Sequence, residues 1–274
     1  MGWNNLVWIT GLFCLFISHH CAGGSSDALV LNGKLTQGSL IRAQLPAGSS
    51  VQLNGKPVEM NNQGKFVFGF EREADLSHTL SWTLPDGSEG KREITLTKRD
   101  YDIQRIDGLK STMVTPPDSV TARIRSDSAR VASARSKKSA EDGVFSGFIW
   151  PAEGPISGVY GSQRILNGEP KWPHYGVDVA GPKGASVVAP AAGVITLAED
   201  LYYSGNTIIL DHGMGVFSTF LHLDTMAVKV GDVLDQGASI GTIGETGRAT
   251  GPHLDWRINL GTQRLDPALL VPDK

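Results

Sequence analysis

The chain has 274 residues, a mass of 29.3 kDa and a formal net charge of -3 at pH 7, with 40% hydrophobic and 19% charged residues. This length accommodates one large or two modest domains. The composition excludes a disordered chain and a broadly membrane-embedded one, and the charge gives no electrostatic reason to expect binding to nucleic acid.

Residues 1–23 are predicted to be a signal peptide. An uncharged apolar run from Leu6 to Ser18 is too short to span a bilayer, which needs about 20 residues. Small residues that a signal peptidase accepts follow this run. We therefore expect an exported protein, with an uncleaved anchor as the alternative. The two cysteines, Cys14 and Cys21, would leave with the leader, which excludes disulfide and thiolate chemistry from the mature chain.

Residues 27–106 are predicted to form a small, immunoglobulin-like antiparallel β-sandwich. Short runs alternate apolar and polar side chains, as in the three phenylalanines of residues 66–70. Asn54-Gly55 stands between two such runs, and this dipeptide favours a tight hairpin turn. The histidine of this domain, His78, has no cluster of metal-ligand type near it in the sequence, so we expect it at the surface.

Residues 107–143 are predicted to be a basic, partly helical linker. Pro116-Pro117 interrupts regular structure, and the stretch that follows is rich in Ala, Ser and Arg. Its positive charge has two explanations. It contacts anionic wall polymers or lipid headgroups, or it belongs to a solvated helix between two domains.

Residues 144–272 are predicted to be a second β-domain. Runs of β-branched residues separated by glycines recur from Val187 to Phe220, and they indicate a mostly antiparallel sheet that is curved or barrel-like. The whole chain is therefore predicted to be mainly β, with a short helical linker between its two domains.

Four of the seven histidines lie in this second domain, at positions 174, 212, 222 and 253. In an extended chain, residues separated by an even number of positions point to the same side. His174 and Asp178 therefore face one cleft, and His253 and Asp255 share a face. Imidazole nitrogens and carboxylate oxygens both bind zinc in proteins. The two pairs predict a three-ligand zinc site with one histidine to spare.

The motifs around these residues resemble a known family. Five segments follow the order of the motifs in the lysostaphin/LytM-type zinc metallopeptidases, metallopeptidase family 23: GSQR, PHYGVDVAGPKGASVVAPAAGVI, DHGMGVFSTFLHL, VKVGDVLDQGASIGTIGETG and TGPHLDWRI. The resemblance covers about residues 145–271. It implies an antiparallel sheet of the duplicated hybrid motif type and one Zn2+ per chain.

Residue by residue, the resemblance implies that His174 and Asp178 are zinc ligands and that His253 and His222 are catalytic. The family's third zinc ligand is the second histidine of an H-x-H motif, and here Asp255 stands in its place. His212 lies in an Asp-His-Gly turn that does not usually bind the metal. We expect His212 to have a structural role or to support the ligands from behind.

Asp255 changes the chemistry expected of the metal site. One histidine and two carboxylates would leave zinc formally neutral, so its bound water would be less acidic than in a site with neutral ligands. Such a site would also tolerate manganese and other hard ions better. We expect an active but altered metal site.

The resemblance implies a zinc-dependent endopeptidase that hydrolyses the peptide cross-links of bacterial peptidoglycan. His253 would take the proton of the attacking water, and His222 would hold the developing oxyanion or assist. Its partners would be peptidoglycan peptide stems, with no nucleic acid and no membrane span after leader cleavage. The protein would work in the periplasm or at the cell wall.

Two alternatives belong to other functional classes. A catalytically impaired domain of the same fold would bind and activate another wall hydrolase, and the departure at Asp255 supports it. A biotinyl or lipoyl carrier is suggested by the hairpin rhythm of VKVGDVLDQGASIG. No lysine stands at a suitable hairpin tip in that segment, and a carrier has no use for the histidines.

Overall fold

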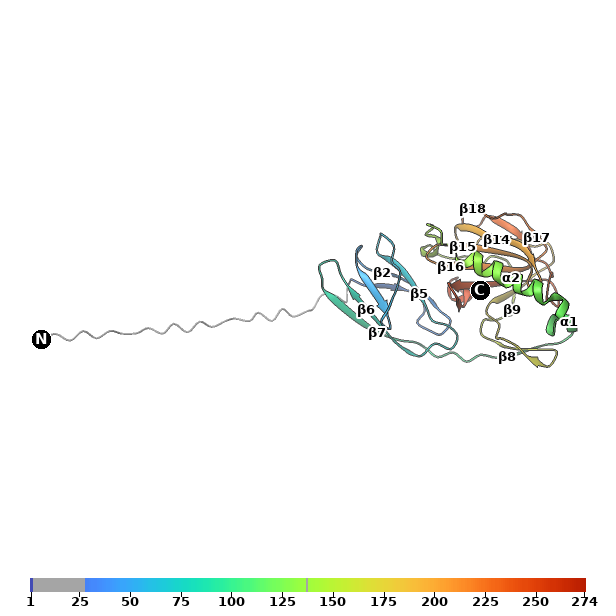
Figure 1. Cartoon of the computed structure of the whole chain (residues 1–274), viewed down its shortest axis with the longest axis horizontal. Helices are drawn as coiled ribbons and strands as arrows, with labels where there is room; N and C mark the ends of the chain where they lie inside the picture. The colour runs from blue at the N-terminus through green and yellow to red at the C-terminus, as the bar shows by residue number, and fades with distance from the viewer. Residues whose placement is uncertain (2–27, 137) are drawn as a thin grey trace.

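The computed structural model describes residue 1, residues 28–136 and residues 138–274. The predicted leader, with both cysteines, lies outside the described residues except for residue 1. Strands predominate, as predicted, and they form two β-regions that follow each other along the long axis of the molecule (Figure 1). In the described part of the chain, no helix is both long enough and apolar enough to cross a membrane.

The N-terminal region is a sandwich of two antiparallel sheets with the strand orders β1-β2-β5 and β4-β3-β6-β7. Its strands are β1 (Val30–Asn32), β2 (Leu40–Gln44), β3 (Ser50–Leu53), β4 (Lys56–Pro57), β5 (Lys65–Gly69), β6 (Ser77–Thr83) and β7 (Glu89–Thr95). Phe66 of one sheet and Leu80 and Trp82 of the other share a buried core. Asn54 and Gly55 both have positive φ, 52° and 74°, and form the predicted tight turn between β3 and β4.

His78 is buried, so the surface position expected from the sequence is wrong. It lies on the inward face of β6 and is only 9% exposed. Its Nδ1 is 2.8 Å from Asn54 Nδ2, and its Nε2 is 2.7 Å from the carbonyl oxygen of Asp75. Because both ring nitrogens have partners, burial of the imidazole leaves no polar atom unsatisfied.

The C-terminal region is built on one large antiparallel sheet with the strand order β18-β14-β15-β16-β20-β12-β9, and β21 pairs with β20. These strands are β9 (Ile156–Gly158), β12 (Val177–Ala180), β14 (Gly193–Leu201), β15 (Gly205–Asp211), β16 (Val216–Leu223), β18 (Val233–Leu234), β20 (His253–Leu260) and β21 (Gln263–Leu265). A smaller sheet contains β13 (Ser186–Val188), β19 (Ser239–Thr242) and β17 (Thr225–Met226). Val187 and Ile240 of this smaller sheet share a buried core with Phe220 and Trp256 of the large one.

The segment between the two β-regions packs against the C-terminal one. Strand β8 (Ile103–Ile106) pairs in parallel with β10 (Gln163–Leu166), which also pairs with β11 (Glu169–Pro170). The sequence predicted that the N-terminal domain ends at residue 106. Strand β8 instead pairs with β10 of the C-terminal region. The limits of the domains remain a prediction. The rest of the segment contains α1 (Ser111–Val114), the 3-10 turns Asp118–Val120 and Gly143–Phe145, and α2 (Thr121–Ser136). A last 3-10 turn, Pro267–Leu269, lies near the C-terminus.

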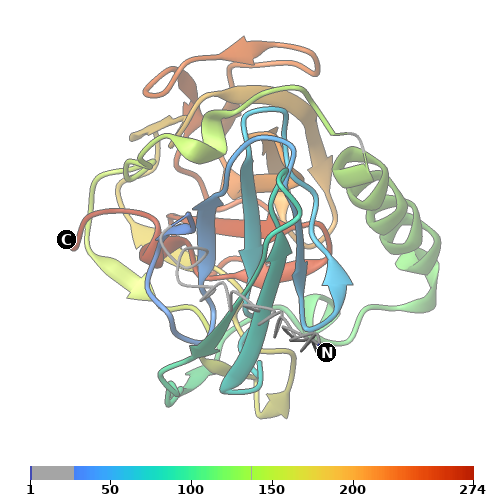
Figure 2. The same ribbon diagram turned by 90° about the vertical axis from the view of Figure 1, so that its left-hand side faces the viewer.

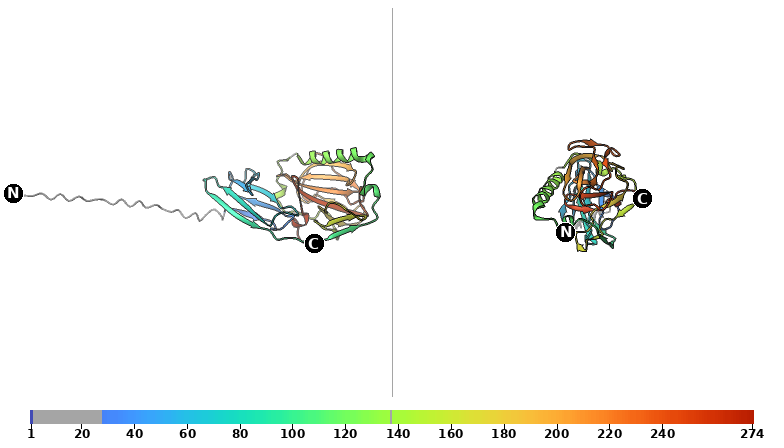
Figure 3. Two further views of the ribbon diagram at one scale, coloured as in Figure 1. Left: turned by 60° about the horizontal axis from the view of Figure 1, so that its bottom comes forward. Right: turned by 90° about the vertical axis from the view of Figure 1, so that its right-hand side faces the viewer.

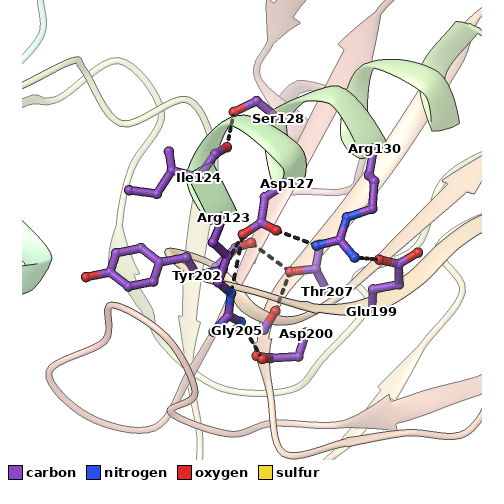
Figure 4. Close-up of polar contacts among 11 residues, drawn as sticks. Arg123, Ile124, Asp127, Ser128, Arg130, Glu199, Asp200, Tyr202, Gly205 and Thr207 are labelled. Atoms are coloured by element: carbon purple, nitrogen blue, oxygen red, sulfur yellow. Dashed lines mark hydrogen bonds and ion pairs between the residues drawn. The ribbon is translucent and has the colours of Figure 1, made fainter. Parts of the chain in front are cut away.

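Helix α2 runs along the outside of the large sheet (Figure 3) and is held there by polar contacts (Figure 4). Two of its arginines pair with carboxylates of β14: Arg123 Nη2 lies 2.6 Å from Asp200 Oδ2, and Arg130 Nη1 lies 2.5 Å from Glu199 Oε2. Asp127, which is buried, accepts a hydrogen bond from the Tyr202 backbone N–H at 2.7 Å. These two arginines form ion pairs with carboxylates of the same chain, so α2 packs on the sheet and is not a solvated spacer.

The sandwich contacts the C-terminal region directly, and Figure 2 shows it in front of that region. Arg99 Nη1 lies 2.7 Å from Asp266 Oδ2, and the Asp266 side chain is only 3% exposed. The backbone N–H of Asp266 donates to the carbonyl oxygen of Gly38 at 2.7 Å. A partly buried ion pair and a backbone hydrogen bond therefore join residues far apart in the sequence.

Candidate metal centre

Strand pairing brings the predicted site residues together at the large sheet. Asp178 of β12 lies directly opposite Asp255 of β20. His174 comes four residues before Asp178, on the chain that leads into β12, and His253 is the first residue of β20. Strand β20 also pairs with β16, and His222 lies near the end of β16. Residues up to 81 positions apart in the sequence, His174 and Asp255, thus contribute to one site.

Three side chains form a compact cluster of possible metal ligands: His174, Asp178 and Asp255. His174 Nε2 lies 3.1 Å from Asp178 Oδ1 and 3.4 Å from Asp255 Oδ2. Ligand atoms about 2.0–2.1 Å from a tetrahedral zinc ion are about 3.3 Å from one another. The spacing of the donor atoms therefore fits one ion held by all three residues.

The cluster also leaves buried polar atoms without partners. His174 is 1% exposed and Asp255 is fully buried. Among the described residues, neither ring nitrogen of His174 has a hydrogen-bond partner, and Asp178 Oδ1 has none either, because their 3.1 Å approach lacks hydrogen-bond alignment. A buried polar atom without a partner is costly, by about 1–3 kcal/mol. A bound cation would satisfy His174 Nε2 and Asp178 Oδ1 at once.

Two glycines, which have no side chain, make room for the carboxylates of Asp178 and Asp255. A Cβ on Gly158 would lie 2.2 Å from Asp178 Oδ2, and a Cβ on Gly176 would lie 2.3 Å from Asp255 Oδ1. Both distances are shorter than side chains tolerate. Gly176 therefore has a steric role in the H-Y-G-V-D segment, in addition to any role in its turn.

Two arginines that the sequence analysis did not single out hold these carboxylates. Arg257 makes a bidentate contact with Asp255, with its Nε 3.0 Å from Oδ1 and its Nη2 2.6 Å from Oδ2. Arg164 Nη2 lies 3.2 Å from Asp178 Oδ2. The sequence contained a signal for Arg257, because a residue two positions after Asp255 in a strand shares its face. Arg164 is the last residue of the GSQR motif, but its partner follows only from the fold.

The charges in the cluster stabilise one another. Burial alone lowers the pKa of His174, but the carboxylates of Asp255 and Asp178 outweigh burial and raise it overall. Burial alone raises the pKa of Asp255, but Arg257 and then His174 outweigh it, so the pKa lies well below its usual value. The pKa of Asp178 is also lowered overall, through His174 and Arg164, against the effects of burial and of Asp255. Both carboxylates are therefore ionised, and the position between them favours a cation.

The two remaining predicted site residues, His253 and His222, lie next to each other beside the cluster. Their ring centroids are 4.9 Å apart, and His253 Nε2 is 3.9 Å from Asp178 Oδ1. His253 Nδ1 donates to the carbonyl oxygen of Gly251 at 2.8 Å, and His222 Nδ1 donates to that of Thr246 at 2.7 Å. In a neutral imidazole this arrangement leaves Nε2 as the acceptor on both rings.

His212 lies apart from the cluster. Its Nδ1 is 2.8 Å from the carbonyl oxygen of Ala192, its Nε2 is 2.7 Å from Ser218 Oγ, and Ser218 Oγ also accepts from Trp256 Nε1. Burial lowers the pKa of His212 to about 4. These contacts support the structural role that was expected for His212.

A cavity of about 310 Å3 opens above the cluster. Asp178, His222 and His253 line it, whereas His174 and Asp255 lie deeper. Its walls come from β8 (Gln104 and Ile106), from β10 (Arg164) and from the loop that contains Arg248 and Thr250. The possible metal ligands therefore lie at the floor of a cleft, with two histidines on its wall.

Comparisons with known proteins place this site in a family. The model of peptidase family M23 matches residues 172–267. The peptidoglycan DD-endopeptidase ShyA of Vibrio cholerae is 38% identical over 86 residues, which are 31% of this chain and 20% of the relative. The DD-carboxypeptidase/endopeptidase Mpg of Neisseria meningitidis is 38% identical over 103 residues, 36% of this chain and 24% of the relative. The chain thus spans only about a fifth to a quarter of these relatives' length.

Solved structures give a similar result. The crystal structure of a putative peptidase M23 from Pseudomonas aeruginosa is 26% identical, covers 86% of this chain and 95% of its own, and superimposes with a TM-score of 0.65. The catalytic domain of lysostaphin from Staphylococcus simulans is 33% identical and matches 41% of this chain and 88% of its own, with a TM-score of 0.38. The chain therefore contains a peptidase family M23 domain, and the His174, Asp178 and Asp255 cluster lies within it.

Proposed function

We propose that the protein is an exported, zinc-dependent endopeptidase that hydrolyses the peptide cross-links of bacterial peptidoglycan in the periplasm or at the cell wall. Relatives named as peptidoglycan endopeptidases support the substrate, and the family supports the reaction class. The observation that carries the proposal is the cluster of unpartnered donor atoms on His174 and Asp178, at the floor of a cleft that His222 and His253 also line.

In this proposal, His174, Asp178 and Asp255 hold the zinc ion. Zinc bound there would supply a Lewis acid for the scissile carbonyl and would make a water molecule more acidic. His253 is placed to accept the proton of that water, because its Nδ1–H is committed to Gly251 and its Nε2 acceptor faces the cluster.

His222 has a narrower role in the proposal than the resemblance implies. Burial lowers its pKa to about 4, so the ring is neutral at working pH. With Nδ1–H committed to Thr246, the neutral ring presents an acceptor at Nε2 and cannot donate to an oxyanion. Of the two roles expected for His222, holding the oxyanion or assisting, we therefore assign assistance in proton transfer. The ring could hold an oxyanion only after it gains a proton.

The charge balance at the site also supports an active enzyme. With Asp255 as a ligand, two carboxylates would neutralise the zinc ion. The guanidinium groups of Arg257 and Arg164 contact these carboxylates and offset their charge. With zinc bound, the site therefore keeps a net positive charge where a reacting carbonyl would become negative. The charges of the three ligands alone would predict a neutral site.

Mass spectrometry of muropeptides tests the proposal. The purified mature protein is incubated with peptidoglycan after zinc loading, after chelation and after zinc is restored. We expect cross-linked dimers to become monomers in the first and third samples only. His253→Gln should bind zinc but lose activity, whereas Asp255→Ala should lose zinc as well. Unchanged muropeptides with the zinc-loaded protein would contradict the proposal.

The bidentate contact between Arg257 and Asp255 favours a second candidate function. A carboxylate held on both oxygens has fewer lone pairs for a metal, as expected of an impaired domain that activates another wall hydrolase. The same samples separate the two functions. A protein that never cleaves by itself, but accelerates an added wall hydrolase with or without chelator, would be such an activator.

A further inference from the structure

Two guanidinium groups line the cleft beside the metal cluster, and the proposed mechanism gives neither of them contact with substrate. Arg164 reaches Asp178 through Nη2, but its Nε is buried and has no partner among the described residues. Its side chain is 15% exposed, and the residue lines the cavity. Arg164 therefore lines the cleft and, within the described residues, keeps donor capacity that no protein atom accepts.

Arg248 lines the same cavity from the facing loop. Its Nη1 donates to the carbonyl oxygen of Met113 at 3.3 Å, and its guanidinium lies 4.7 Å from the ring centroid of Tyr203. Within the described residues, no carboxylate lies at ion-pair distance from Arg248. The aromatic ring and the carbonyl fix the side chain and leave further N–H groups for a ligand.

The two guanidinium groups belong to residues that line the same cavity. Burial is the main cause that lowers the pKa of Arg248, and repulsion from Arg164 is the next. Two partly buried cations that face one cavity are stabilised by an anion between them. Guanidinium groups bind carboxylates with a geometric match that neutral peptide groups lack.

We propose that Arg164 and Arg248 bind a free carboxylate of the substrate peptide, on a residue that flanks the scissile bond. The position follows from Arg164, which contacts the outer oxygen of Asp178 and so lies one carboxylate away from the proposed zinc ion. The inference rests on the proposed function and narrows its substrate class to peptides that are anionic beside the bond to be cut. The carboxylate has two possible sources: the end of a peptide chain, or a diamino acid that forms the cross-link and keeps its own carboxylate.

Binding measurements on the full mature chain after chelation test this inference without turnover. Two synthetic ligands represent the two sources: a linear stem peptide with a terminal carboxylate, and a branched peptide whose bridging diamino acid keeps one. Each has a twin in which that carboxylate is a carboxamide. We expect at least one carboxylate form to bind roughly 10-fold to 100-fold more tightly than its twin, as charged hydrogen bonds predict. The form that shows the preference identifies the source.

Matched variants assign the preference to the arginine pair. Arg248→Gln should remove it, and Arg248→Lys should keep only part of it, because an ammonium group lacks the planar fork. Arg105→Gln is the control, since Arg105 lies on β8 but is exposed and does not line the cavity. Thermal unfolding of each variant shows whether it has folded.

The outcomes separate this inference from the proposed function. Equal affinity for both members of each pair, or a preference that survives in folded Arg248→Gln, overturns the inference even if the zinc-loaded protein cleaves peptidoglycan. A preference that Arg248→Gln abolishes supports the inference, even if the zinc-loaded protein cleaves nothing and the proposed function fails.

Discussion

His78 of strand β6 in the N-terminal sandwich and His174, on the chain that leads into β12 in the C-terminal region, are both buried, yet their ring nitrogens have opposite surroundings. Both nitrogens of His78 have hydrogen-bond partners. Among the described residues, His174 has none, and two carboxylates approach it instead. A buried imidazole with its bonds satisfied supports the fold by itself, whereas one without partners among ionised carboxylates is completed by a cation.

Replacing these two histidines should have the largest and most different effects, on zinc binding and activity for His174 and on stability for His78. His174→Gln should abolish zinc binding, and with it activity should fall by on the order of 1000-fold or more, since a lost metal removes several kcal/mol of stabilisation of the transition state. His78→Ala should leave zinc content unchanged and lower the free energy of unfolding by about 1–3 kcal/mol. Metal analysis and urea unfolding measure both effects. Full zinc occupancy in His174→Gln would remove the basis of the comparison.

The pH dependence of stability sharpens the comparison between buried histidines with and without partners. His212 lies in the C-terminal region, like His174, but both of its ring nitrogens have hydrogen-bond partners. Its pKa is about 4 in the folded protein and about 6.5 in an unfolded chain, so the unfolded state takes up a proton first as pH falls. Its contribution to stability is complete above about pH 6.5 and is lost as pH falls toward 4, by up to about 3 kcal/mol.

Urea unfolding of the metal-free wild type and of His212→Gln between pH 7 and pH 4.5 isolates this contribution. The wild type should lose more stability than the variant over this range. His222 has a similarly lowered pKa but is present in both proteins, so its effect cancels in the difference. Parallel pH profiles for the two proteins would show that His212 is not held neutral by burial.

A pair of glycine substitutions should give the smallest effect. A Cβ on Gly176 would press on Asp255, and we expect Gly176→Ala to lower zinc affinity by about 10-fold to 100-fold, as for other changes behind metal ligands. A Cβ on Gly90 would lie 2.3 Å from the Trp82 ring in the sandwich. Gly90→Ala should lower the free energy of unfolding by about 1–3 kcal/mol without affecting zinc. Equal zinc affinity in wild type and Gly176→Ala would show that the site adjusts to the extra methyl group.

Features that depend on neighbours in the chain were predictable from the sequence. The Asn54-Gly55 turn has the expected positive φ values, because this dipeptide tolerates them at low cost. The sequence predicted that His174 and Asp178 lie on one side of an extended chain, and the structure brings them together. The reason differs, because residues four apart in an extended strand are about 13 Å apart and the 3.1 Å contact depends on a bend at Gly176. Their roles as metal ligands remain predictions.

Features that depend on distant segments were not predictable in this way. The surface position expected for His78 was wrong because its partner Asn54 lies 24 positions away. The basic linker gave no sign that Arg130 pairs with Glu199, since a charge run has the same composition whether it faces solvent or a sheet. The contact of Arg164 with Asp178 depends in the same way on which segments lie side by side.

The sequence by itself determined the β-architecture, because it follows from side-chain alternation over a few positions. The donor set of one histidine and two carboxylates was implied by the resemblance to the metallopeptidase family, and it remains a prediction. Only the tertiary structure decided that Asp178 lies opposite Asp255, that Arg164 contacts Asp178, and that β8 and Arg248 line the cleft. Strand register and packing between segments far apart in the chain set these relations. They result from burial and charge summed over the whole domain, which no local pattern contains.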